Sequence, residues 1–396
     1  MAESAAASTA RDFGVYVHVP FCAVRCGYCD FNTYAVGEVE GATPDGYVHA
    51  ALQEIALARH TMGEDSRLVS TVFFGGGTPT LLNADALATV LAHIAEAWGL
   101  EPGVEVTTEA NPDSVTRESL ARLASAGFTR VSFGMQSAVP HVLATLDRTH
   151  NPENVARAVE WAKEAGLKVS LDLIYGTPGE SESDWLTSVE AALSLEPDHL
   201  SAYALVIEPG TRMGAQLRRG EIAAVNADVQ ARMYELADDA FVAAGYDWYE
   251  VSNWAKTPAD RCRHNVAYWM SQDWWGVGPG AHSYLGPRTG PDGSPLPARR
   301  WWNVKNPRAY AERLAAGLSP EQEGEELSPQ EQALETVMLR LRLSEGLPVG
   351  LVTRPQGVAP LIADGVLEGR EALQGTLKLT RRGRLLADRA VRELTA

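Results

Sequence analysis

Three shortages in this sequence each exclude a class of protein. Only four cysteines occur among 396 residues, and three of them fall within eight positions, whereas secreted proteins spread paired cysteines along the chain as disulfides. No segment approaches the roughly 20 apolar residues that cross a bilayer. Acidic residues outnumber basic ones by 51 to 34, a net charge of −17, which repels nucleic-acid phosphates and anionic membranes. We therefore expect no nucleic-acid partner and no integral membrane segment.

The beginning of the chain lacks the features of an export signal. The first twelve residues, MAESAAASTARD, contain small side chains but no basic start followed by an apolar run. We predict a disordered leader over residues 1–12 and a cytoplasmic protein. The length allows one large domain with a smaller one, and the 45% share of apolar residues is ordinary for a globular core.

Short β-rich runs alternate with helical stretches through the first half of the chain. The apolar residues recur at helical spacing in three segments, 84–98, 119–127 and 154–166. This repeated βα pattern predicts parallel strands in a barrel or an open doubly wound sheet, and both place chemistry at the C-terminal ends of the strands. The strands are predicted over residues 13–19, 70–74, 104–109, 130–134, 168–174 and 199–205.

The pattern changes in the second half, which predicts further domains. Seven of the ten tryptophans lie between residues 248 and 302, and the Gly- and Pro-rich segment 287–298 is typical of a loop or hairpin tip. Large aromatic side chains more often form a protein core than a ligand-binding surface, although this density of tryptophans also suits the binding of a porphyrin. We predict a barrel domain over 13–245, an aromatic-rich connecting region over 246–317, and a small, mostly helical, winged-helix-like C-terminal domain over 318–396.

The cysteine cluster directly follows the first predicted strand. Cys22, Cys26 and Cys29 form a C-x3-C-x2-C run. Thiolates are soft ligands suited to iron–sulfur clusters, and three of them on a four-iron cubane leave one iron open. The alternative is a zinc site with His18 or a distant residue as fourth ligand. It is the weaker one, because structural zinc sites usually pair two separated ligand knuckles and this chain has no second C-x2-C.

The cysteine run, with Tyr28 just before its last cysteine, resembles the motif of the radical S-adenosylmethionine (SAM) superfamily. The run GGGTPT at 75–80, after the second strand, resembles the glycine motif that receives the amino group of SAM. The resemblance implies an α/β fold, an open partial TIM-type (β/α)6 barrel. It also implies a [4Fe-4S] cluster on the three cysteines, SAM on the open iron, and competence for reductive SAM cleavage.

Polar residues at further strand ends extend the resemblance over nearly the whole chain. It is similar to the family that holds the anaerobic coproporphyrinogen III dehydrogenases (HemN) and the haem chaperones (HemW). Singly, each polar residue could equally be a helix cap or a solvated charge. The resemblance implies that SAM contacts Tyr16, Gly76, Gly77, Thr78, Glu109, Gln136, Arg148, Asp172 and Ala204.

Three features favour the chaperone branch. Phe31 stands where the dehydrogenases have a further cysteine, only about a dozen residues precede Phe13, and RCRHNVAYW at 261–269 matches the HNxxYW element of the chaperones. We therefore expect a haem chaperone that delivers haem to acceptor haemoproteins such as respiratory enzymes, with an electron donor for its cluster. The alternative is an oxygen-independent coproporphyrinogen III dehydrogenase, so whether the chain is an enzyme stays open.

His264 of that element is the candidate haem ligand. A neutral imidazole is a common axial ligand of haem iron, and nearby aromatics offer a flat apolar face. The alternative is that His264 and Asn265 cap a helix while Tyr268 and Trp269 fill the junction between domains. Cys262 could assist as a thiolate or be an inert buried thiol.

Overall fold

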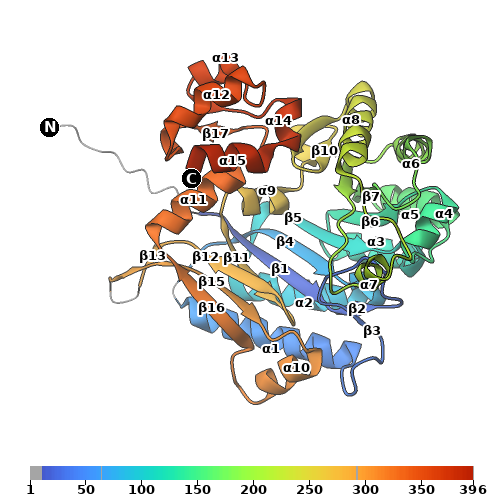
Figure 1. The fold of residues 1–396 in the computed structure, drawn as a ribbon. Coiled ribbons are helices and arrows are strands. Elements are labelled where there is room, and N and C mark those ends of the chain that lie inside the picture. Colours follow the sequence, from blue (N-terminus) through green and yellow to red (C-terminus); the bar gives the residue numbers. More distant parts are fainter. Residues whose placement is uncertain (1–10, 64, 291–292, 396) are drawn as a thin grey trace.

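One 12-stranded sheet runs through most of the molecule, in the order β16-β15-β12-β11-β1-β4-β5-β6-β7-β8-β10-β9 (Figure 1). The computed structural model describes residues 11–63, 65–290 and 293–395, so most of the predicted leader lies outside the described residues. Seven neighbouring strands at the centre of the sheet are parallel. They are β11 (Asp273–Val277), β1 (Phe13–Val19), β4 (Val69–Gly76), β5 (Leu100–Ala110), β6 (Arg130–Gln136), β7 (Lys168–Tyr175) and β8 (His199–Ala204).

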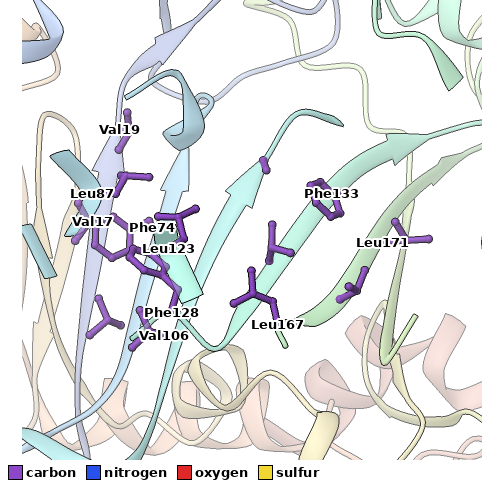
Figure 2. Packing of buried hydrophobic residues seen from close by; sticks show 14 of the residues in the cluster. Val17, Val19, Phe74, Leu87, Val106, Leu123, Phe128, Phe133, Leu167 and Leu171 are labelled. Atoms are coloured by element: carbon purple, nitrogen blue, oxygen red, sulfur yellow. The ribbon is translucent and has the colours of Figure 1, made fainter. Parts of the chain in front are cut away.

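Helices cover the outer face of these strands, which confirms the predicted βα barrel. Each strand sends apolar side chains outward to meet them, and Figure 2 shows Val17, Phe74, Val106, Phe133 and Leu171 of successive strands in one continuous core. Burial of this apolar surface is the main stabilising contribution to the fold. The covering and connecting helices are α1 (Pro44–Met62), α2 (Ala84–Trp98), α3 (Arg117–Ser125), α4 (Pro140–Thr145), α5 (Pro152–Glu164), α6 (Glu182–Ser194), α7 (Arg212–Arg218) and α8 (Ala227–Ala243).

The inner face of the same strands is polar. In β6 the outward Val131 and Phe133 are fully buried, whereas Arg130, Ser132 and Gly134 point the other way and line a cavity. This follows from the period of two along a strand. A closed TIM barrel fills its interior with layers of branched apolar side chains. In this barrel, polar side chains of the strands line an interior cavity instead.

The aromatic-rich region widens the sheet at both edges. β10 (Asn253–Ala255) and β9 (Asp247–Glu250) extend it antiparallel beyond β8, while β12 (His282–Leu285) and β15 (Ala298–Asn303) extend it beyond β11. β16 (Glu321–Leu327), within the range predicted for the C-terminal domain, pairs with β15 and belongs to the same sheet. The short strands β13 (Arg288–Thr289) and β14 (Pro295–Leu296) pair within the predicted hairpin, whose residues 291–292 lie outside the described residues. Three of the seven tryptophans in this region, Trp254, Trp275 and Trp301, are buried core residues.

Helix α9 (Arg263–Trp269) lies across the N-terminal end of the barrel. Its first two backbone amides, of Arg263 and His264, donate to the carboxylate of Glu105 over 3.1 Å each. The His264 ring is bonded to Thr71, near the start of β4. Figure 1 shows α9 between the strands and the C-terminal helices. The HNxxYW element therefore occupies the end of the barrel opposite the cysteines.

The C-terminal residues form a small, mostly helical unit with its own core. Val337, Leu341, Leu361, Val366 and Leu394 are fully buried in it. In the part of the chain that the structure describes, no helix is long and apolar enough to span a membrane. The unit consists of α11 (Pro329–Arg340), α12 (Val358–Ala363), α13 (Gly369–Leu373), α14 (Arg381–Leu385) and α15 (Ala387–Thr395), with β17 (Leu347–Pro348) paired to β18 (Thr376–Leu377).

A buried carboxyl ties α1 to the widened part of the sheet. Glu54 is 1% exposed and accepts hydrogen bonds from the Gly278 amide at 2.8 Å, the Asn303 side chain at 2.7 Å, and the hydroxyl of Tyr310 on α10 (Pro307–Ala315). Burial raises the pKa of Glu54 to about 7. The folded state thus binds a proton at this carboxyl that the unfolded chain releases near its ordinary pKa.

Glu54→Gln tests this linkage. Because the folded pKa lies above the unfolded one, the stabilising contribution is complete below pH 4.5 and is lost as the pH rises through about 7. We expect wild-type apoprotein to lose about 2.5 kcal/mol relative to the variant between pH 5 and 8, because most of the linkage from its pKa shift is lost in that range. Denaturant titrations at several pH values measure this, and a difference between the two proteins that stays constant with pH would contradict it.

Candidate functional site

The barrel encloses a cavity of about 690 Å³. It extends from the cysteine loop at the C-terminal ends of the strands to α9 at their N-terminal ends. Most residues singled out in the sequence line it, although they come from seven separate segments. They are Cys22, Cys26, Cys29, Gly76, Gly77, Thr78, Glu109, Gln136, Arg148, Asp172 and Ala204.

Three partly exposed thiols gather at the cavity mouth. Arg148 Nη1 donates to Cys26 Sγ over 3.6 Å, and Cys29 Sγ lies 4.0 Å from the hydroxyl of Thr33. Burial, with the neighbouring Cys29 and Cys26, raises the pKa of Cys22 to about 11. Three thiolates this close repel one another, and a cationic metal centre relieves that repulsion. The donor set therefore fits a metal group that takes three thiolates.

A single zinc ion fits these residues less well. In the described ranges, no three side chains of His, Cys, Asp or Glu converge on one ion position. The His18 ring is engaged elsewhere, with Nδ1 3.0 Å from the Tyr16 hydroxyl and Nε2 2.9 Å from the Asn32 carbonyl oxygen. A cubane spreads its ligands over separate irons, whereas zinc collects four donors around one point. The three thiols are compatible with separate irons of a cubane.

The glycine loop after β4 is held against the cysteine loop. A Cβ at Gly77 would lie 2.4 Å from the Phe21 carbonyl oxygen and 3.1 Å from Cys22 Sγ, so no larger residue fits. The Gly77 amide donates to Val19 O and the Thr78 amide to Phe21 O, both at 2.7 Å. The two loops therefore form one unit, and the glycine is needed for close backbone approach.

Two carboxyl groups project into the cavity from neighbouring levels of the sheet. Glu109 Oε2 accepts from the Gly76 amide at 3.1 Å, and Asp172 Oδ2 accepts from the Ser132 hydroxyl at 2.9 Å. Burial, and then the charge of Asp172, raises the pKa of Glu109 to about 8, and burial also raises the pKa of Asp172. At neutral pH this pair can donate as well as accept hydrogen bonds.

Gln136 and Arg148 carry polar atoms that lack a partner among the described residues. Gln136 is 8% exposed with its Oε1 unpaired, and its φ of +57° is unusual for a residue other than glycine. Arg148 donates from Nη2 to Gly134 O over 2.9 Å, while its Nε is unpaired. Buried polar atoms normally find a partner, and strained backbone concentrates at functional sites. This end of the cavity is suited to a polar ligand.

Tyr16 and His264 lie outside the cavity lining. The His264 ring is 1% exposed, with Nδ1 2.8 Å from the Thr71 hydroxyl and Nε2 2.8 Å from the Tyr268 hydroxyl. It stacks on Phe73, and Tyr16 stacks on both rings. Burial lowers the pKa of His264 to about 3, so the imidazole is neutral. Both ring nitrogens are engaged, and ligation of an iron would require one of these hydrogen bonds to open.

The residues that line the lower part of the barrel cavity were not predicted from the sequence. Thr107, Arg130, Ser170 and His199 line it near α9. The signal was present, because RVSFGMQ and KVSLDLIY place polar residues at every second position of apolar strands. Cys262 also lines this part, and burial raises the pKa of its thiol, which lies 3.7 Å from Glu105 Oε1. It is a buried thiol and not a thiolate.

A second cavity, of about 420 Å³, lies beside α9 at the edge of the barrel. We call it the seam cavity. Five of its nine lining residues are aromatic or aliphatic, which suits a flat apolar ligand. Two of its residues, Tyr203 and Asn265, also line the barrel cavity, so the two spaces adjoin. The lining consists of Tyr203, Glu250, Val251, Ser252, Asn253, Asn265, Tyr268, Trp269 and Leu339.

Comparison with known proteins identifies the family. The model of the radical SAM superfamily matches residues 16–192. The chain is 48% identical over 388 residues to a Mycobacterium tuberculosis protein named heme chaperone HemW, covering 97% of this chain and 95% of the relative. A Bacillus subtilis protein of the same name is 33% identical, with 84% of each chain covered.

The solved structure of HemN, the coproporphyrinogen III oxidase of Escherichia coli, has the same fold. It superposes with a TM-score of 0.80 at 21% identity, over 98% of this chain and 90% of the other. The likeness extends through the C-terminal unit and confirms the predicted fold class. Together with the sequence identities to proteins of one name, these matches show that the chain belongs to the HemW family of the radical SAM superfamily.

Proposed function

We propose that this chain is a cytoplasmic haem chaperone that carries a [4Fe-4S] cluster and SAM, binds haem, and delivers it to acceptor haemoproteins such as respiratory enzymes. The adjoining cavities carry the proposal. One begins at three thiols and holds the polar residues of the strands, and the other is lined by Asn265, Tyr268 and Trp269 of the HNxxYW element. The names of the relatives support the same assignment.

Cys22, Cys26 and Cys29 would hold the cluster, with SAM beside it. When bound, this pair supplies reductive cleavage of SAM, for which an electron donor is needed. The Arg148 guanidinium is suited to the methionine carboxylate. An ammonium only donates hydrogen bonds, so it would meet the backbone carbonyl oxygens of Gly77 and Thr78 and not their amides. Further proposed contacts are Tyr16, Gly76, Glu109, Gln136, Asp172 and Ala204.

Haem would lie in the seam cavity against Tyr203, Tyr268 and Trp269. Flat aromatic side chains stack well on a porphyrin. His264 stands directly behind Tyr268, at the far end of the hydrogen bond from Nε2 to its hydroxyl. The proposed ligation by His264 therefore requires Tyr268 to turn aside, which frees a neutral imidazole nitrogen for the iron.

The second candidate function is oxygen-independent dehydrogenation of coproporphyrinogen III. The fold shared with HemN favours it. Phe31 favours the chaperone, because it lines the cavity mouth with 59% of its surface exposed where the dehydrogenases have a further cysteine.

Serine variants test the cluster. Replacing Cys22, Cys26 or Cys29 singly should remove most of the iron, acid-labile sulfide and visible absorbance from anaerobically reconstituted protein, because a weaker oxygen ligand replaces a thiolate. Cys262→Ser is the matched control and should keep all three signals. A cluster retained in the first three variants would contradict the proposed ligand set.

A turnover assay separates the two functions. Reconstituted, reduced protein is incubated anaerobically with SAM and coproporphyrinogen III, and the products are separated by chromatography. The chaperone proposal predicts that protoporphyrinogen does not form above the level of a Cys26→Ser control. Its formation at catalytic turnover would establish the dehydrogenase instead.

Two variants test His264 as the haem ligand. His264→Ala should change the haem absorption spectrum and weaken binding about tenfold or more, the effect of losing a coordinate bond worth at least 1.4 kcal/mol. Tyr268→Phe removes the hydroxyl bonded to Nε2 and should strengthen haem binding, because no hydrogen bond has to open first. Spectra unchanged by His264→Ala, with the cluster intact, would remove His264 from the proposal.

A further inference from the structure

The proposed SAM contacts leave the lower part of the barrel cavity unused. We call this part the floor chamber. Thr107 and Arg130 are register partners on β5 and β6, and Ser170 and His199 on β7 and β8. At roughly 3.3 Å per residue, Thr107 lies about 7 Å below Glu109 on the same strand. The floor chamber is lined by Thr107, Arg130, Ser170, His199, Cys262 and Asn265.

Arg130, which lines this chamber, has side-chain donors without a partner among the described residues. Its side chain is 2% exposed, and Nη2 donates to Asp260 O at 2.7 Å and Arg261 O at 3.0 Å. Its Nε and Nη1, and the hydroxyl of Thr107 beside it, have no partner in the described part of the chain. Buried donors without acceptors are costly and rare. Their grouping at one level of the cavity indicates that an acceptor belongs there.

The charges around Arg130 favour one negative group. Its nearest acid, Glu105, lies 3.3 Å away and also accepts from the amides of Arg263 and His264. Burial, and then Arg130, lowers the pKa of His199 well below its ordinary value, and the ring stays neutral between Ser170 and a tyrosine hydroxyl. The chamber thus offers one partly compensated cation among neutral donors. A carboxylate brings one charge and a planar pair of acceptors, which matches a guanidinium.

The seam cavity lacks a cationic side chain among its described lining residues. Among the described residues that line it there is no lysine or arginine, and its one ionisable acid is the buried Glu250. An anionic substituent on a ligand in the seam therefore finds no cation in that lining. Asn265 lines both spaces, so the floor chamber, with Arg130 in its lining, adjoins the seam cavity.

We propose that the floor chamber binds a carboxylate of the ligand that occupies the seam cavity, and that for a tetrapyrrole this is a propionate, held by Arg130 and the Thr107 hydroxyl. The inference rests on the proposed haem function and adds the recognition element for the propionate side chain. Iron ligation fixes the centre of a porphyrin, whereas a buried propionate fixes its rotation about the iron.

Esterified haem tests the proposal. Protein reconstituted with cluster and SAM is titrated with haem and with haem dimethyl ester, and the affinities are read from the visible spectrum. Wild type should prefer haem by roughly ten- to a hundredfold, the range for a hydrogen bond to a charged group. Arg130→Gln should remove this preference, lowering haem affinity to that of the diester and leaving diester affinity unchanged.

Two further variants separate recognition from folding. Thr107→Val keeps the side-chain shape and should weaken haem a few-fold without affecting the diester. Arg67→Gln is the matched control, because Arg67 pairs with Asp273 at 2.8 Å and lines neither cavity. It should change neither affinity.

Two results would overturn the carboxylate chamber while leaving haem binding intact. One is equal affinity of wild type for haem and diester, and the other is an equal loss for both ligands in Arg130→Gln. A wild-type protein that binds neither porphyrin would instead overturn the proposed haem function.

Discussion

The carboxylate of Glu105 holds together the N-terminal end of the barrel. It accepts from the first two amides of α9, lies 3.7 Å from the Cys262 thiol, and pairs with Arg130. The contacts with Cys262, Arg263 and His264 join the connecting region to a strand more than 150 residues earlier, and the pair with Arg130 joins β5 to β6. Without this anion, the α9 amides and the Arg130 guanidinium would be buried with fewer partners, a costly arrangement. The walls of both cavities depend on α9 and therefore on Glu105.

A barrel with a polar interior has to obtain its stability elsewhere. Here the outward residues of the parallel strands and the helices that cover them form the main core. The inner face can then hold acids, hydroxyls and an arginine without carrying the packing of the fold. This division also explains why removing a cavity-facing hydroxyl is a mild test of binding, whereas removing an outward aromatic residue would leave a large hole.

Much of the secondary structure in the first half of the chain could be predicted, because the sequence patterns that specify it are local. The structure has β1 at Phe13–Val19 and α2 at Ala84–Trp98, the bounds that strand composition and helical spacing indicate. β11 was missed because its partner β1 lies some 260 residues away, and nothing in the run DWWGV announces a parallel pairing. Non-local pairing of this kind is decided by tertiary packing, not by propensity.

In the candidate site too, local sequence signals predict some features, and the others depend on residues far away in the sequence. The motif residues of the cysteine and glycine loops line one cavity, as their place after parallel strands predicts. The orientation of His264 could not be predicted, because Thr71 and Phe73, which fix its ring, come from a strand nearly two hundred residues earlier. The alternation of polar and apolar residues along β6 could have predicted that Arg130 faces the cavity. Its unpaired nitrogens could not be predicted, because they depend on the residues that surround it in space.

Tyr203 and Asn265 line both cavities. A ligand that orders or displaces either side chain changes the shape offered to a ligand on the other side. Thermodynamic linkage makes such an influence mutual, so that each ligand alters the affinity of the other by the same factor. If the two proposed ligands occupy these cavities, Tyr203 and Asn265 are side chains through which one ligand can affect the binding of the other.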